Sequence, residues 1–243
     1  MGKVLIVADS SHWYNFAEGL KQLDKTGADI EIYQSSAYQH SLVGSALNLA
    51  NVNVGDSAEA DLLARQYSLV VSIHCKQIFH RNLTKNTLCI NMHPGILPHG
   101  RGWNPYAFAL NDGTAAGATL HVMDEEIDHG PVIAVQVILK QPEDTCDTLY
   151  QRVQKAEEAL ITEWFPKLIK GDFTVQSPFC NPQPRAKTKK DYAELCKLNL
   201  DSMDARQLLK RLAALTYDGQ LHANFTDASG RQLHVGVTFG REV

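Results

Sequence analysis

The stretch from Cys89 to Trp103, CINMHPGILPHGRGW, decides how this chain presents its functional residues. It begins as an apolar run and becomes polar and proline-rich, with Asn91 and His93 two positions apart. A strand has a side-chain period of two, so Asn91 and His93 project from the same face. Pro94 and Gly95 then end the strand and keep the next segment extended. The sequence therefore predicts a strand that delivers a polar pair to one point.

The segments before this stretch alternate between strand and helix patterns. Apolar runs at 3–8, 69–74 and 88–93 predict buried strands, and residues 28–34 alternate as a strand does. Helical spacing predicts helices over 11–25 and 57–67, the second capped by Ser57, while residues 35–55 are weakly patterned. Such alternation is typical of a parallel α/β sheet, in which ligands bind at the carboxyl ends of the strands.

The second half of the chain changes character near residue 174. A short helix closed by Gly113, strands over 117–124 and 130–139, and a long amphipathic helix ending at Gly171 come first. The helix opens at Asp144 or Thr145, and its apolar stripe includes Trp164. Residues 174–190 are rich in proline and basic residues, as linkers are, and are followed by helical patterns and a hairpin with its turn at 227–230. The sequence predicts a catalytic domain over 1–173 and a linker, helices and β-hairpin over 174–243.

Composition limits the classes of protein to which the chain can belong. It has 243 residues, 44% hydrophobic and 21% charged, with a formal net charge of −4, which is ordinary for a soluble globular protein. This charge argues against a nucleic-acid partner, and no apolar run is long enough for a signal peptide or a membrane span. Five scattered cysteines without a CxxC pattern indicate free thiols. We expect a cytoplasmic protein without a membrane partner.

A carboxylate joins the polar pair from a distant segment. Asp128 lies in the polar turn of HVMDEEIDHGPVI (121–133), next to His129 and Gly130. An amide can stabilise an oxyanion, an imidazole can assist proton transfer, and a carboxylate can orient that imidazole. Asn91, His93 and Asp128 together therefore favour acyl transfer to an amine. A single histidine at a strand end is more often a structural residue, and that alternative stays open on Asn91 and His93 alone.

Two segments together carry a resemblance to a known family. The stretch INMHPGILPHGRGWNPYAFAL, followed by GATLHVMDEEIDHGPVI, resembles the folate-dependent formyltransferases, which carry N-x-H-P-[SG]-x-L-P-x-x-R-G and later D-x-G. Asn91, His93 and Asp128 fall on that family's catalytic residues. The resemblance implies a Rossmann-like fold with a mixed, largely parallel sheet and a C-terminal helix and β-hairpin extension. It also implies formyl transfer from the co-substrate N10-formyltetrahydrofolate to an amine. No GxGxxG motif is present, so no dinucleotide is inferred.

Further segments are similar to one branch of this family, the bacterial sugar N-formyltransferases. They are VSIHCKQIF, RLAALTYDG and NFTDASGRQLHV, and the similarity extends over nearly the whole chain. It implies a nucleotide-linked amino sugar as acceptor, above all dTDP-4-amino-4,6-dideoxyglucose, used for lipopolysaccharide O-antigen or another glycan. It also implies a homodimer formed through the C-terminal end. By analogy with the family, folate contacts are expected near Ile78, His129 and Gly130.

The sugar acceptor suggests roles for further residues, each with a structural alternative. Lys76 and Arg101 are candidates for phosphate, although Lys76 can equally be solvated and Arg101 is better explained as holding its loop. Trp103 and Tyr217 are candidates for stacking on sugar or base, but an aromatic residue at the position of Tyr217 is more often packing. His12 and Trp13, which with Ser10 follow the first strand, are candidate acceptor contacts.

Other functions remain as alternatives. The acceptor could be a 3-amino sugar, a GDP- or UDP-linked sugar, a ribonucleotide amine or charged tRNA. Several histidines suggest metal-assisted deacylation, but neither an HExxH nor a CxxC pattern is present, so no metal is expected. A catalytically silent module that binds nucleotide sugars is the third alternative, and the presence of Asn91, His93 and Asp128 argues against it.

Overall fold

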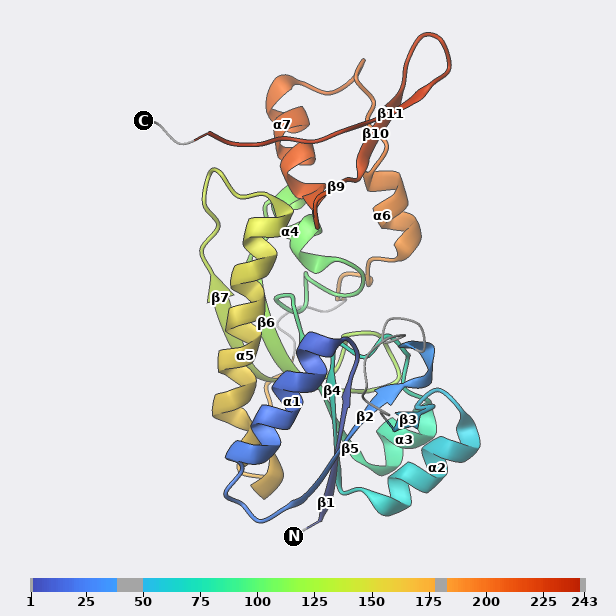
Figure 1. The fold of residues 1–243 in the computed structure, drawn as a ribbon, viewed down its shortest axis with the longest axis vertical. Helices are drawn as coiled ribbons and strands as arrows, with labels where there is room; N and C mark the ends of the chain where they lie inside the picture. The colour runs from blue at the N-terminus through green and yellow to red at the C-terminus, as the bar shows by residue number, and fades with distance from the viewer. Residues whose placement is uncertain (1, 39–49, 178–182, 241–243) are drawn as a thin grey trace.

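A seven-stranded sheet forms the centre of the computed structural model, which describes residues 2–38, 50–177 and 183–240 (Figure 1). The strand order is β3-β2-β1-β4-β5-β6-β7. Strands β1 to β5 are parallel, whereas β6 and β7 are antiparallel to their neighbours, so the predicted mixed and largely parallel sheet is confirmed. The strands are β1 Lys3–Ala8, β2 Asp29–Ser35, β3 Asn51–Val52, β4 Leu69–Ile73, β5 Leu88–His93, β6 Ala116–Val122 and β7 Val132–Ile138.

Helices cover both faces of this sheet. Helices α1 (Ser11–Leu23) and α5 (Cys146–Lys170) pack on one face, where Ile6, Val71 and Ile90 meet Leu160 of α5. Helices α2 (Ser57–Gln66) and α3 (Arg81–Asn86) pack on the other face, against the intervening strand residues. Because both faces are buried, the central strands are continuous apolar runs rather than alternating ones.

Two helices differ from the prediction, α2 in its N-cap residue and α5 in the aromatic residue that it buries. Asp56, not Ser57, caps α2, because its carboxylate accepts hydrogen bonds from the N–H groups of the first turn. Both residue types cap helices, and the sequence alone does not say where the first turn begins. On α5, Phe165 rather than Trp164 is fully buried in the apolar stripe, while Trp164 is half-buried at its edge. The caps of α5, Thr145 and Gly171, lie at the predicted ends.

The C-terminal part packs on helix α4 (Pro105–Asp112), which ends at Gly113 as predicted. Its elements are α6 Lys189–Leu195, α7 Ala205–Ala214, β8 Thr216–Tyr217, β9 Gln220–Leu221, β10 Ala223–Thr226 and β11 Gln232–Val235. Phe108 of α4 joins Leu195, Leu215 and Ala223 in one apolar cluster. The hairpin β10–β11 lies where it was predicted. The division of the chain at residue 173 stays a prediction.

Three further observations bear on the predictions. A short 3₁₀ helix, Ser36–Tyr38, lies in the weakly patterned segment, most of which is outside the described residues. Four cysteines are free thiols, Cys75, Cys89, Cys146 and Cys196, while Cys180 lies outside the described residues. Within the described ranges, no helix is long and apolar enough to cross a membrane.

Candidate active site

Neighbouring strands end together at one edge of the sheet and gather polar side chains there. Strand β5 carries Asn91 and His93, and β6 runs antiparallel beside it, pairing Asn91 with His121 and His93 with Thr119. The turn after β6 brings Asp128 back over the end of β5, with its backbone in the left-handed region at a φ of 46°. A non-glycine residue rarely adopts this conformation, and such residues cluster at functional sites.

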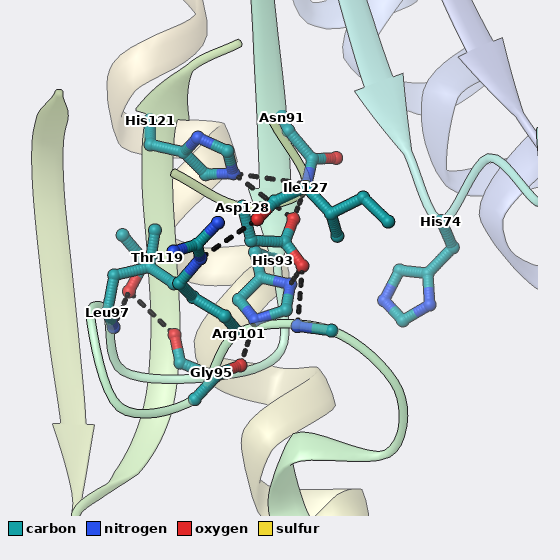
Figure 2. A network of polar contacts seen from close by, with 12 residues as sticks. His74, Asn91, His93, Gly95, Leu97, Arg101, Thr119, His121, Ile127 and Asp128 are labelled. Carbon is teal, nitrogen blue, oxygen red and sulfur yellow. Dashed lines mark hydrogen bonds and ion pairs between the residues drawn. The ribbon is translucent and has the colours of Figure 1, made fainter. Parts of the chain in front are cut away.

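The carboxylate of Asp128 is the centre of this polar group (Figure 2). Its Oδ1 accepts a hydrogen bond from Asn91 Nδ2 at 3.2 Å and lies 3.6 Å from His121 Nε2. Its Oδ2 accepts a hydrogen bond from the Gly102 N–H at 2.9 Å and lies 3.5 Å from His93 Nδ1. The structure thus brings together Asn91, His93 and Asp128, which the sequence carries on two separate segments.

Asp128 is held in its charged form. Burial alone would raise the pKa of this carboxyl, because burial disfavours a charge. The His93 imidazole and the N–H of Gly102 act in the opposite direction and prevail, so the pKa of Asp128 lies well below its usual range. An ionised carboxylate only accepts hydrogen bonds, which fixes the Asn91 amide with its NH₂ group toward Asp128.

Backbone carbonyl oxygens determine which ring nitrogen carries a hydrogen in His93 and in His121. His93 Nε2 lies 2.6 Å from the Gly100 carbonyl, so it carries a hydrogen, and Nδ1 is the atom that faces Asp128. His121 Nδ1 lies 3.0 Å from its acceptor, the Val122 carbonyl, so Nδ1 carries a hydrogen. His121 Nε2 lies 3.2 Å from Asn91 Nδ2 and can accept the second amide hydrogen. The Asn91 NH₂ group is therefore shared between Asp128 and His121.

The loop after β5 is fastened by two buried side chains. Arg101 is only 5% exposed, and its guanidinium donates to the Ile127 and Pro184 carbonyls and to the Glu126 carboxylate. Arg101 therefore holds its loop in place, as the structural interpretation of the sequence expected, and it also fixes the turn that carries Asp128. Thr119 donates from its hydroxyl to the Gly95 carbonyl at 2.6 Å, which fastens the start of the same loop.

This arrangement suits acyl transfer. A carboxylate, an imidazole and an amide meet at one point at the carboxyl edge of a parallel sheet, which is where such sheets bind ligands. Positioned N–H groups stabilise the charge that develops on an attacked carbonyl oxygen, and a carboxylate–imidazole pair can move a proton. Within the described part of the chain, no three or more His, Cys, Asp or Glu side chains are grouped to hold a metal ion.

Comparison with known proteins now identifies the family. Residues 15–165 match the family model described as formyl transferase. The chain is also 34% identical over 240 residues, 98% of its length and 97% of the relative's, to dTDP-4-amino-4,6-dideoxyglucose formyltransferase from Mycobacterium tuberculosis. The chain belongs to the formyl transferase family. Within it, the whole-length similarity places the chain in the sugar N-formyltransferase branch.

Solved structures of other formyltransferases share this fold over most or all of the chain. A sugar N-formyltransferase from Shewanella sp is 29% identical, with a TM-score of 0.91 and full coverage of both chains. A 4-N formyltransferase from Francisella tularensis is 27% identical, with a TM-score of 0.89 and 99% coverage of both. A more distant N-formyltransferase from Helicobacter canadensis, crystallised with folinic acid and dTDP-3-aminofucose, is 18% identical, with a TM-score of 0.72 and 90% and 82% coverage.

Three residues predicted to contact an acceptor, His12, Trp13 and Lys76, follow strands β1 and β4. Trp13 is 3% exposed and stacks on His74 with ring centres 4.6 Å apart, so its ring is packed inside the protein. His12 is exposed, and its Nε2 lies 2.8 Å from a Glu158 carboxylate oxygen. Lys76 has an exposed side chain, while its backbone N–H donates to the buried Asp9 carboxylate. Of the three, Lys76 and His12 present polar groups to solvent.

On the C-terminal side, the two predicted aromatic contacts differ. Trp103 is 38% exposed, and Lys189 Nζ lies 4.7 Å from its ring centre. The Trp103 N–H donates a hydrogen bond to the Lys187 carbonyl at 2.8 Å. This bond fixes the loop that carries Gly102 and Trp103 to the segment that contains Lys187 and Lys189. Tyr217 is half-buried and packs against Tyr106 and Tyr150. It is thus a packing residue, which was the structural alternative to stacking on a base.

The residues expected near folate lie on two loops. Ile78 follows β4 with 69% of its side chain exposed, and His129 Nδ1 lies 2.7 Å from Asp124 Oδ2. Gly130 is buried, and a Cβ there would lie 2.0 Å from the Val122 carbonyl oxygen, so the backbone passes close to β6. Ile127, beside Asp128, is 47% exposed. Exposed apolar side chains beside a polar centre fit a flat, partly apolar group such as the pterin ring of a folate.

Sequence reasoning missed three residues of the site. His121 was only one of the several histidines considered for a metal site, and Thr119 and Gly102 were not singled out. The alternation in GATLHVMD offered a signal, because Thr119 and His121 fall on the same face between apolar neighbours. Gly102 falls on the last glycine of the family motif, but its contribution is a backbone N–H, which the sequence does not reveal.

Proposed function

We propose that this formyltransferase moves a formyl group from N10-formyltetrahydrofolate to the amine of a nucleotide-linked amino sugar. The observation that carries the proposal is the Asp128 carboxylate, in contact with both Asn91 and His93 at the edge of the sheet. The whole-length similarity to a dTDP-4-amino-4,6-dideoxyglucose formyltransferase supports that sugar as the acceptor. A place in O-antigen or other glycan biosynthesis is part of the same proposal.

In the proposed reaction, the neutral amine of the sugar attacks the formyl carbon. Negative charge then develops on the formyl oxygen, where an N–H of Asn91 can donate a hydrogen bond, and His93 can donate a second one if its Nε2–H moves from the Gly100 carbonyl to that oxygen. Asp128 holds the imidazole through Nδ1 and accepts the amine proton directly or through His93. The Asn91 NH₂ group already donates hydrogen bonds to Asp128 and His121. When the substrate binds, one of these hydrogen bonds must therefore be replaced by one to the formyl oxygen.

The donor site proposed for the folate uses Ile78, His129 and Gly130, joined by Ile127. The partial exposure of Ile78 and Ile127 and the close passage of the backbone at Gly130 support it. The acceptor site proposed for the nucleotide sugar uses Lys76, His12 and Trp103. When bound, N10-formyltetrahydrofolate would supply the activated formyl group, and the protein would supply orientation and charge stabilisation.

An acceptor screen read by mass spectrometry tests this proposal. Purified protein and N10-formyltetrahydrofolate are incubated separately with dTDP-4-amino-4,6-dideoxyglucose, its 3-amino isomer, UDP- and GDP-linked amino sugars, and glycinamide ribonucleotide. We expect the mass of one formyl group to appear on the 4-amino dTDP sugar. Formylation of another member alone would contradict the proposed acceptor, and no formylation of any nucleotide sugar would contradict the proposed function.

A further inference from the structure

A second histidine, His74, directly follows strand β4 beside the catalytic group, and its ring contacts a buried carboxylate. The register between β4 and β5 pairs Ile73 with Met92, so His74 and His93 follow at adjacent positions. His74 has a φ of 55°, in the left-handed region that non-glycine residues rarely adopt. Figure 2 shows its ring on the side of the sheet edge where His93 and Asp128 lie.

The carboxylate belongs to Glu157, which lies inside helix α5. Its side chain is fully buried, and Oε1 lies 2.9 Å from His74 Nε2. The other oxygen, Oε2, is buried without a hydrogen-bond partner among the described residues. A buried carboxylate is costly unless it is paired, so a polar pair of this kind needs an explanation.

The contacts leave one ring nitrogen of His74 for a ligand. The carboxylate of Glu157 accepts a hydrogen from Nε2, which leaves the lone pair of the neutral ring on Nδ1. One face of the ring is covered by Trp13, and the side chain keeps 10% of its surface exposed. No hydrogen bond to Nδ1 occurs within the described residues. His74 thus combines an oriented ring, a buried counter-charge and an unused acceptor atom.

We propose that His74, oriented by Glu157, accepts a proton from the ammonium form of the acceptor before formyl transfer. This inference rests on the proposed function, because it requires an amine acceptor. An N–H bond of the ammonium breaks, its electron pair stays on nitrogen, and the proton binds His74 Nδ1. Glu157 stabilises the resulting imidazolium through Nε2–H. His74 then releases this proton to water, and Asp128 and His93 handle the second amine proton, which ends on the departing folate nitrogen.

Among the described residues, Glu157 is the charged group that contacts the His74 ring. Trp13 brings no charge, and Asp9 is already bonded to Ser35 and to the Lys76 N–H. The titratable and charged groups from the surrounding elements are Asp9 after β1, His12 on α1, Cys75 and Lys76 after β4, His93 on β5, and Tyr150, Glu157 and Glu158 on α5. Since His12 is bonded to Glu158, Glu157 is the acidic group in direct contact with the His74 ring.

The test is the pH dependence of kcat/KM for the acceptor, measured for wild type, His74→Ala, His74→Asn and Glu157→Gln. We expect His74→Ala to lose about 100-fold at pH 7, in the range of general-base contributions. The loss should shrink to a few-fold at about pH 9.5, because solution then supplies the free amine. Glu157→Gln should show the same pattern with a smaller loss. Binding of 5-formyltetrahydrofolate by each variant reports that the protein is folded.

A carboxylate on the same helix provides the matched control. Glu163 is exposed on α5 and pairs with Lys167, so Glu163→Gln should keep the wild-type profile. Two results would overturn the inference: wild-type activity in His74→Ala at pH 7, or a loss that is equal at every pH. Both presuppose that wild type formylates an amine. If wild type fails to do so at any pH, it is the proposed function that fails instead.

Discussion

The Asn91 amide nitrogen lies 3.2 Å from Asp128 Oδ1, so the proposed oxyanion donor is already bonded to the proposed proton acceptor. The same nitrogen lies 3.2 Å from His121 Nε2. These contacts orient the amide, and one of them must be exchanged for the formyl oxygen when a substrate binds. They also mean that the three catalytic candidates act as one unit, and that their mutational effects should not add.

Replacing Asn91 should remove the oxyanion donor. We expect Asn91→Ala to reduce kcat on the order of a hundredfold or more, with a small change in KM for folate. Stopped-time assays of formylated sugar give both constants. The double variant Asn91→Ala/Asp128→Asn should lose much less than the product of the two single losses. Nearly normal turnover in Asn91→Ala would remove Asn91 from the mechanism.

Asp128 should stabilise the fold in a pH-dependent way. Because its folded pKa is lowered, its contribution is present above the unfolded value of about 4 and is lost as the pH falls through the lowered folded value. We expect Asp128→Asn to reduce the free energy of unfolding by about 1–3 kcal/mol at pH 7. Urea unfolding at lower pH should show the difference from wild type shrinking below about pH 4. A difference that grows with acidity would contradict this assignment.

Gly102 should tolerate no side chain. Its φ is 89°, and a Cβ would lie 2.1 Å from the Lys187 carbonyl oxygen. Gly102→Ala must therefore displace the loop and weaken the hydrogen bond from the Gly102 N–H to Asp128. We expect a loss of about 1–3 kcal/mol in the free energy of unfolding and a clear fall in kcat.

Gly113 offers a matched control for this substitution. It also has a positive φ, 79°, but among the described residues a Cβ there would meet only Lys210 Nζ, at 3.5 Å. Gly113→Ala should cost stability without changing kcat. Equal effects of the two substitutions on kcat would show that backbone strain alone, and not the link to Asp128, explains Gly102.

The C-terminal hairpin should mediate the proposed homodimer. Ala223 and Val235 of its inner face pack on the chain's own apolar cluster, whereas Leu233 is 39% exposed. A two-stranded hairpin must dock on its own domain or on a partner; because Leu233 stays exposed after the hairpin has packed on its own domain, we expect a second copy to cover this end. Leu233→Glu should reduce the dimer fraction in analytical ultracentrifugation, and Leu62→Glu, on the exposed side of α2, should not. A wild-type protein that is monomeric at every concentration would contradict the proposal.

Much of this architecture is readable from the sequence because it depends on periodicity. The apolar runs at β1, β4 and β5 predict buried parallel strands, and the pattern of Asn91 and His93 places both on one face. The contributions of Gly102 and of the Gly100 carbonyl were not readable, since backbone groups leave no mark in a sequence. Nor was the burial of Trp13, which depends on the tertiary position of His74.

Transfer of the formyl group to the sugar amine can be followed with a labelled donor. Wild-type protein is incubated with N10-formyltetrahydrofolate that carries ¹³C in the formyl group, together with dTDP-4-amino-4,6-dideoxyglucose, and the products are followed by NMR. We expect the label to appear as a formamide on the sugar nitrogen, and Asn91→Ala to slow its appearance. Label that stays on folate, or that is released as free formate while the sugar amine is unchanged, would contradict the proposed function.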